Sequence, residues 1–127
     1  MEPHSAADAY RRSTIENAPP VQVVRLLYQG ALQFLERARR EDAADVSSRF
    51  LYWIGRADAI VTELRLAIDH SVGEELTRDL ERLYLFCEDE LGRAGLERSP
   101  APIDGVVRVL ETLLDAWKHV EVEASAV

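Results

Sequence analysis

APPVQVVRLLYQGALQFLERARR, residues 18–40, is the stretch around which the fold of this chain is organised. Asn17 and the pair Pro19 and Pro20 are typical of a helix start, because a proline in the first turn loses no intrahelical hydrogen bond. Apolar residues then recur at helical spacing. They predict a buried stripe made of Val24, Leu27, Tyr28, Ala31, Leu35 and Ala38.

This predicted helix carries more apolar surface than a single bundle core requires. A bundle helix needs an apolar arc of only about 100°, whereas four further residues widen the arc here to about 180°. These four residues are Val21, Val23, Leu32 and Phe34. Leu26 lies beyond even this arc, close to Gly30. The excess indicates a second partner, which is an arm of the same chain, another subunit or a bound client.

Composition and charge exclude several classes of protein. The 127 residues fit one domain, and 47% hydrophobic with 30% charged residues is an ordinary globular composition. The net charge of -8 argues against nucleic-acid binding, which requires Lys and Arg on phosphates. Cys87 is the only cysteine, so a reducing compartment is expected. With no apolar signal segment and no membrane-length apolar run, we expect a cytoplasmic protein without membrane insertion.

Residues 1–17 form a short, mostly polar arm in which Tyr10 and Ile15 are the apolar exceptions. One interpretation is a frayed terminus that carries two stray apolar residues. The other is an arm that folds back onto apolar surface. Composition alone leaves both open.

The second helix is predicted from about Val46 to Asp69, with Ser47 or Asp45 as its cap. The expected buried stripe is Val46, Phe50, Trp53, Ala57, Ile60, Val61, Leu64, Ala67 and Ile68. Tyr52, Ala59 and Leu66 form a thinner apolar line on another side of this helix, seven residues apart. Scattered surface apolar residues are normal, but a line at this spacing favours a groove.

Two more helices follow in the C-terminal half. A capping box at Ser71 and Glu74 predicts the start of the third helix, which stops near Leu96. Its expected buried stripe is Leu76, Leu80, Leu83, Tyr84, Cys87, Leu91 and Ala94, and Leu85 and Phe86 fall off this stripe. The fourth helix is expected from about Ile103 to Val120. Its expected stripe is Ile103, Val106, Val107, Leu110, Leu113, Leu114 and Trp117.

Four helical periods joined by short links, with no period-two alternation, predict an all-α fold. The expected architecture is an antiparallel up-and-down four-helix bundle over residues 18–121, with the arm at 1–17 and a frayed tail at 122–127.

No residue pattern indicates an active site. His4, His70 and His119 lack the Glu-x-x-His spacing of di-iron bundles, and the glycines are isolated rather than grouped in a phosphate loop. Cys87 lies on an apolar stripe, which is typical of a buried inert thiol. We therefore expect no catalytic residue, no metal and no cofactor. The surplus of the chain is apolar surface, which points to binding another polypeptide.

Several segments, in order, carry a resemblance to a known family. They are Tyr10, then NAPPVQVVRLLYQGALQFLERA (17–38), ELRLAID (63–69), GEELTRDLERLYLF (73–86) and LLDAWK (113–118). The chain resembles the flagellin export chaperone family, FliS, over nearly its whole length. The helix-two segment FLYWIGRADAI (50–60) is more aromatic than the family pattern.

The resemblance implies an antiparallel bundle that binds the disordered C-terminal segment of flagellin. Such a protein keeps flagellin monomeric in the cytoplasm and delivers it to the flagellar export machinery. The residues that we expect to touch the client are Tyr10, Ile15, Leu26, Gly30, Tyr52, Ala59, Leu66, Leu85 and Phe86.

Two other classes of function stay open at this stage. One is a self-associating helical-bundle adaptor with a different polypeptide client, in which the extra apolar faces form a homodimer. A monomer or a weak homodimer is therefore expected. The other is a carboxylate metal enzyme, which analysis of bound iron or manganese would test.

Overall fold

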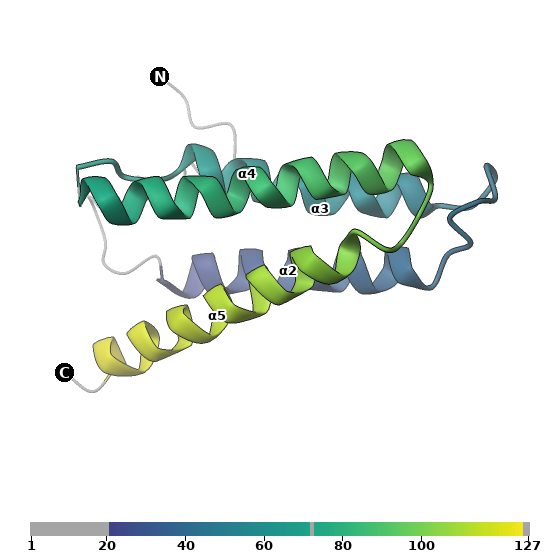
Figure 1. The fold of residues 1–127 in the computed structure, drawn as a ribbon. Coiled ribbons are helices and arrows are strands. Elements are labelled where there is room, and N and C mark those ends of the chain that lie inside the picture. The colour runs from purple at the N-terminus through teal and green to yellow at the C-terminus, as the bar shows by residue number, and fades with distance from the viewer. Residues whose placement is uncertain (1–20, 72, 126–127) are drawn as a thin grey trace, which may run out of the picture.

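The computed structural model describes residues 21–71 and 73–125. These residues form four helices: α2 (Val21–Arg39), α3 (Phe50–Leu66), α4 (Glu74–Glu97) and α5 (Ile103–Ser125). Successive helices run in opposite directions, and α5 is inclined to the other three (Figure 1). Each helix packs against two others, in the pairs α2 with α3, α3 with α4, α4 with α5 and α5 with α2. The predicted all-α antiparallel up-and-down bundle is confirmed.

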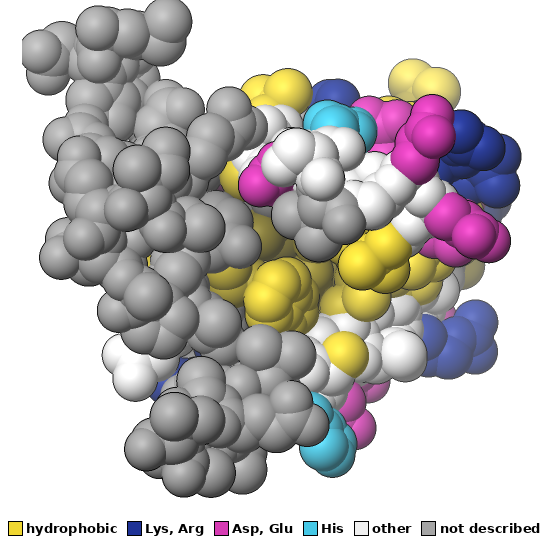
Figure 2. Space-filling model, turned by 90° about the vertical axis from the view of Figure 1, so that its left-hand side faces the viewer, with side chains coloured by type: hydrophobic (Ala, Val, Ile, Leu, Met, Phe, Trp, Pro, Cys, Tyr) yellow, Lys and Arg dark blue, Asp and Glu magenta, His cyan; other side chains and the backbone are white. Residues whose placement is uncertain are grey.

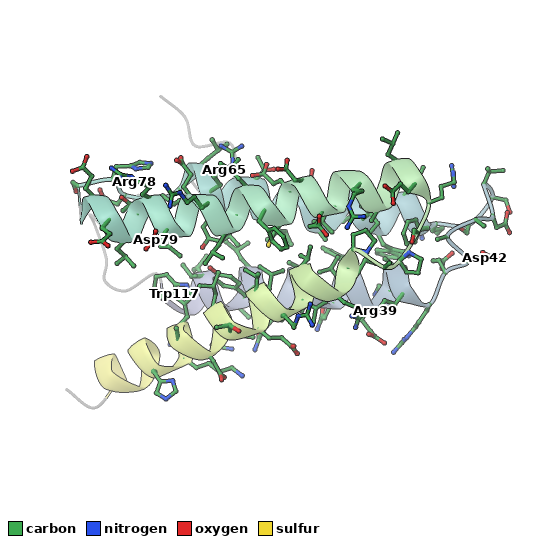
Figure 3. All side chains as sticks on the ribbon, viewed as in Figure 1. Arg39, Asp42, Arg65, Arg78, Asp79 and Trp117 are labelled. Carbon is green, nitrogen blue, oxygen red and sulfur yellow. The ribbon has the colours of Figure 1, made fainter. Side chains whose placement is uncertain are left out.

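The core is built from the stripes that helical periodicity predicts, because residues three and four apart lie on one side of a helix. Its largest fully buried side chains are Tyr28, Phe50, Leu35, Leu91, Ile103, Leu110, Val61, Val106 and Cys87. Trp117 of α5 is only partly buried and packs against this core from one side. Figure 3 shows Trp117 near the end of the bundle where α2 begins.

A polar contact joins three helices inside this apolar core. The hydroxyl groups of Tyr28 on α2 and Tyr84 on α4 are hydrogen-bonded to each other. The indole Nε1 of Trp117 donates to the Tyr28 hydroxyl oxygen at 3.3 Å. A buried hydroxyl without a partner costs about 1–3 kcal/mol, so this pairing makes burial of both tyrosines possible. It also ties α2 to α4, which lie diagonally across the bundle.

The predicted start of the second helix is wrong by four residues. α3 begins at Phe50 because two aspartates hold the preceding segment in turns. Asp42 Oδ1 accepts from the Ala44 amide at 3.1 Å, and Asp45 Oδ1 accepts from the Ser47 amide at 2.8 Å. Such side-chain bonds to the backbone compete with helix formation. Val46 therefore lies in a turn and is 78% exposed rather than buried.

The predicted capping box at the start of the third helix is also wrong. Gly73 is the N-cap of α4, and no side chain caps this end. The Ser71 hydroxyl instead donates to Asp69 at 2.6 Å, and Thr77 donates to the Gly73 carbonyl oxygen at 2.8 Å. The hydrogen bond to Asp69 orients the Ser71 side chain toward the end of the preceding segment instead of toward the first amides of α4.

Two further boundaries and two stripe positions differ from prediction. α3 ends at Leu66, three residues before its predicted end at Asp69. α5 continues to Ser125, five residues past its predicted end at Val120. Leu76 is 59% exposed and Leu83 is also exposed, although both share the phase of the α4 stripe. Leu76 lies in the first turn of α4, where little of the neighbouring helices remains to cover it.

Candidate functional site

The outer side of the α2–α3 pair carries a set of residues that we call the α2/α3 face: the exposed apolar residues Leu26, Tyr52, Ala59 and Leu66, and the half-buried Gly30. Leu26 is 59% exposed, Tyr52 45% and Leu66 58%. Ala59 is exposed as well. One exposed leucine needs no explanation. A row repeated every seven residues along α3 does, because its members lie on one side of the helix, about two turns apart.

Gly30 sets how closely α2 approaches α3. A Cβ atom built on Gly30 would lie 3.4 Å from Cδ1 of Ile60, so the two helices are in close contact there. Leu26 lies one helical turn before Gly30 on the same side of α2. The structure thus brings five of the predicted client-binding residues onto neighbouring helices. Their contact with a client stays a prediction.

Leu85 and Phe86 do not belong to the α2/α3 face. Both are exposed on α4, about 100° apart around its axis, so they point in different directions. The Phe86 ring lies against Gly105 of α5, where an added Cβ would meet Cζ at 3.3 Å. Tyr10 and Ile15, the other two predicted contacts, lie outside the described residues.

A second apolar surface runs between α4 and α5. A shallow cavity of about 220 Å³ there is lined by Leu83, Arg108, Val109, Thr112 and Leu113. It lies on another side of the molecule from the α2/α3 face, because α4 packs against α3 and α5 packs against α2. Leu83 and Leu113 were expected in the buried stripes of their helices, so the sequence did not predict this surface.

A third apolar surface is a cavity at the end of the bundle where α2 begins and α3 ends. Its volume is about 160 Å³, and it is lined by Val24, Leu64, Ala67, Ile68, Asp69, Leu76, Thr77, Leu80, Tyr84 and Trp117. Figure 2 looks at this end and shows hydrophobic side chains gathered in a hollow. The helical periodicity of the sequence did not predict this cavity. Periodicity does not show where an apolar stripe extends beyond the ends of the neighbouring helices.

The side of α3 that meets α4 is polar and paired. Glu88 of α4 accepts hydrogen bonds from the Thr62 hydroxyl, at 2.8 Å, and from the Arg65 guanidinium. Figure 3 labels Arg65 on this part of α3. Asp58 lies nearby, and partial burial together with the Glu88 charge raises the pKa of its carboxyl, against the opposing effect of Arg65. Among the described residues, Asp58 Oδ1 has no hydrogen-bond partner.

The titratable side chains that the structure describes give little support to a catalytic or metal site. Burial raises the pKa of the Cys87 thiol to about 12, so the thiol stays protonated at neutral pH and is a poor nucleophile. Within the part of the chain that the structure describes, no three His, Cys, Asp or Glu side chains are placed to share a metal ion. None of the described helices is long and apolar enough to cross a bilayer.

Apolar surfaces on several sides of a small helical bundle are typical of proteins that bind another polypeptide. The comparisons with known proteins agree with this class. Residues 3–124 match the family described as "Flagellar protein FliS". The chain belongs to the FliS family of flagellar secretion chaperones.

Individual relatives match over nearly their full length. The flagellar secretion chaperone FliS of Campylobacter jejuni is 30% identical over 120 residues, covering 94% of each chain. FliSB of Pseudomonas aeruginosa is 30% identical over 116 residues, covering 88% of this chain and 92% of the relative. FliS of Salmonella typhimurium is 28% identical over 126 residues, covering 95% and 93%.

Proposed function

We propose that this protein binds the disordered C-terminal segment of flagellin, prevents premature polymerisation in the cytoplasm and delivers flagellin to the flagellar export machinery. Family membership supports a chaperone role. The observation that carries the flagellin proposal is the α2/α3 face, whose exposed residues repeat at helical spacing. An amphipathic client helix with anchors at i, i+3 or i+4 and i+7 fits such a surface.

The separate surface between α4 and α5 supports a client that wraps around the bundle. A segment that folds on binding can cover two sides of a small protein, whereas a rigid globular partner covers one. Filament assembly depends on the flagellin ends, so covering one end keeps the subunit monomeric. Export then requires only that the bound segment be released at the secretion machinery.

The experiment is calorimetric titration of the full chain with the host's own flagellin, with and without its last few dozen residues. Binding to intact flagellin and loss of binding to the truncated form is the expected result. Equal binding to both forms would place the client segment elsewhere in flagellin. No binding to either would overturn the proposal.

A self-associating adaptor is the second candidate function, favoured by the same exposed apolar residues. In that case the apolar faces pair between two copies of this chain. Sedimentation at several concentrations distinguishes the two, because a mass that stays monomeric leaves the faces open for a client. A stable dimer that flagellin does not dissociate would favour self-association instead.

A further inference from the structure

Six residues form an arginine–aromatic cluster near the end of α2 and the start of α3: Phe34, Arg37, Arg49, Tyr52, Trp53 and Arg56. The rings of Phe34 and Trp53 stack across the two helices, with centroids 5.7 Å apart. The Tyr52 ring meets Trp53 edge-on at 4.8 Å. The three rings form a platform on which the arginine side chains rest.

Each arginine of the cluster lies over a ring. The Arg49 guanidinium carbon is 4.1 Å from the Tyr52 ring centroid, Arg37 is 4.9 Å from Trp53, and Arg56 is 5.1 Å from Phe34. Stacking restrains a guanidinium but leaves the N–H groups at its edge available as donors. The side chains are therefore positioned in advance for an anion, which lowers the entropy lost on binding.

None of these three guanidinium groups forms an ion pair within the described part of the chain. Arg39, Arg40, Arg65, Arg78 and Arg93, by contrast, each form an ion pair with a carboxylate. Glu41 is the neighbouring carboxylate, and its Oε1 accepts from the Arg49 backbone amide at 2.8 Å. Glu36 pairs with Arg39 and Arg40 instead.

The cluster is a local positive site on a chain whose net charge is -8. The N-terminus of α3, which begins at Phe50, adds a partial positive charge beside it. Tyr52 belongs both to the cluster and to the exposed line that continues to Ala59 and Leu66. The cluster is therefore one end of the α2/α3 face, and that end is suited to a negative group.

The distance along this face sets the length of the occupant. From Tyr52 to Leu66, α3 advances by about 21 Å at about 1.5 Å per residue, which suits a bound helix of about 14 residues. A helix whose C-terminal end lies at the arginines places the negative end of its dipole there. A C-terminal client segment also ends in an α-carboxylate, which arginine binds with paired hydrogen bonds.

We propose that the arginine–aromatic cluster binds the C-terminal carboxylate of the client polypeptide, so that the client's last helix lies on the α2/α3 face parallel to α2 and antiparallel to α3. This inference rests on the proposed function, because it takes a client that binds by its C-terminal segment. It assigns the direction in which the client helix lies, and it makes the terminal carboxylate a recognition group that exists only at a chain end.

The test uses the full chain and two synthetic peptides that cover the last few dozen residues of the host's flagellin. One peptide is a free acid and the other is its C-terminal amide, so they differ by a single charged group. We expect the amide to bind about tenfold more weakly, since it lacks the negative charge that strengthens hydrogen bonds from arginine. Raising the salt concentration should narrow this difference.

Variants locate the effect on the protein. Arg49→Gln combined with Arg56→Gln should bind acid and amide equally. Arg82→Gln, an exposed arginine of α4 outside the cluster, should keep the tenfold difference. Melting temperatures of both variants show whether the bundle is intact, and a double variant that unfolds is replaced by each single substitution.

Several results would overturn the proposal and leave the proposed function standing. Equal binding of acid and amide to the unsubstituted chain removes the terminal carboxylate from recognition. If the double variant still binds the acid more tightly than the amide, the carboxylate binds elsewhere. If the double variant loses the same affinity for both peptides, the cluster only contributes packing. A dimer that the double variant dissociates makes it a contact between copies. Failure of both peptides to bind would instead overturn the proposed function.

Discussion

Helix α3 has two sides that use arginine in opposite ways. Toward α4, Arg65 is bound to Glu88, which also accepts from Thr62, so the charge is neutralised within the fold. Toward α2, Arg49 and Arg56 rest on aromatic rings and form no ion pair with a described residue. The first side holds two helices together. The second presents apolar and cationic surface outward, as we propose for a client-binding surface.

The largest effect on binding is expected from a charge on the outward side of α3. Ala59→Asp places an unpaired carboxylate in the middle of the α2/α3 face. Burying it under a client helix should cost about 2–3 kcal/mol, or about 100-fold in affinity for flagellin. Because Ala59 is exposed, the melting temperature should change little.

Calorimetry and a thermal melt measured on the same sample check both halves of this prediction. Ala59→Ser is the matched control, since it adds a small polar group without charge. Unchanged affinity in Ala59→Asp would exclude this edge from the site. Loss of the helical signal would show that Ala59 packs inside the fold.

A change on the inward side of α3, where it meets α4, should lower stability and leave client affinity unchanged. Glu88→Ala removes the acceptor of Arg65 and Thr62, both partly buried, and should lower the free energy of unfolding by about 2 kcal/mol. Affinity for flagellin should stay the same. Glu88→Gln keeps the hydrogen-bonding oxygen and should lose less. Urea denaturation measures the stability, and an unaltered midpoint would mean that this network contributes nothing net.

Residues 1–17 are expected to compete with the client for the apolar surface. We predict that this arm covers part of the site in the free protein, on the sequence evidence of Tyr10 and Ile15. If about nine molecules in ten are covered, deleting the arm should tighten binding about tenfold, near 1.4 kcal/mol. Tyr10→Ala should act in the same direction.

Titration of residues 18–127 and of Tyr10→Ala against the full chain decides this point. Weaker binding by both would show that the arm contacts the client directly. Affinities equal to that of the full chain would leave the arm without a role in binding.

The smallest expected effect concerns Asp58 on the inward side. Partial burial and Glu88 raise its pKa above 3.8, so ionised Asp58 opposes folding at pH values above its folded pKa. Asp58→Asn should therefore raise the melting temperature at pH 7.5, by about 2–4 °C. As the pH falls through the raised pKa toward 3.8, the carboxyl is protonated in the fold and this advantage should shrink. A gain that stays constant with pH would assign the effect to packing.

Helical periodicity predicted the core well, because residues such as Tyr28, Val61, Leu91 and Leu110 lie at regular angles around their helix axes. The out-of-phase line Tyr52, Ala59 and Leu66 was also found, since the same angles identify what points away. Turn chemistry was less predictable. An aspartate can either cap a helix or accept a hydrogen bond from a nearby backbone or hydroxyl group, as Asp42, Asp45 and Asp69 do. The local sequence does not show which of these hydrogen bonds forms.

The apolar period, the link lengths and the order of motifs in the sequence were enough to predict four amphipathic helices, their antiparallel order and membership of the chaperone family. The packing of the helices was needed to see that Leu76 is exposed while Leu80, at nearly the same angle, packs against the core. It also decided that Arg65 meets a carboxylate and Arg49 a ring. The physical reason is that periodicity fixes the direction of a side chain around its helix. The position of the neighbouring helices along that axis decides what the side chain meets.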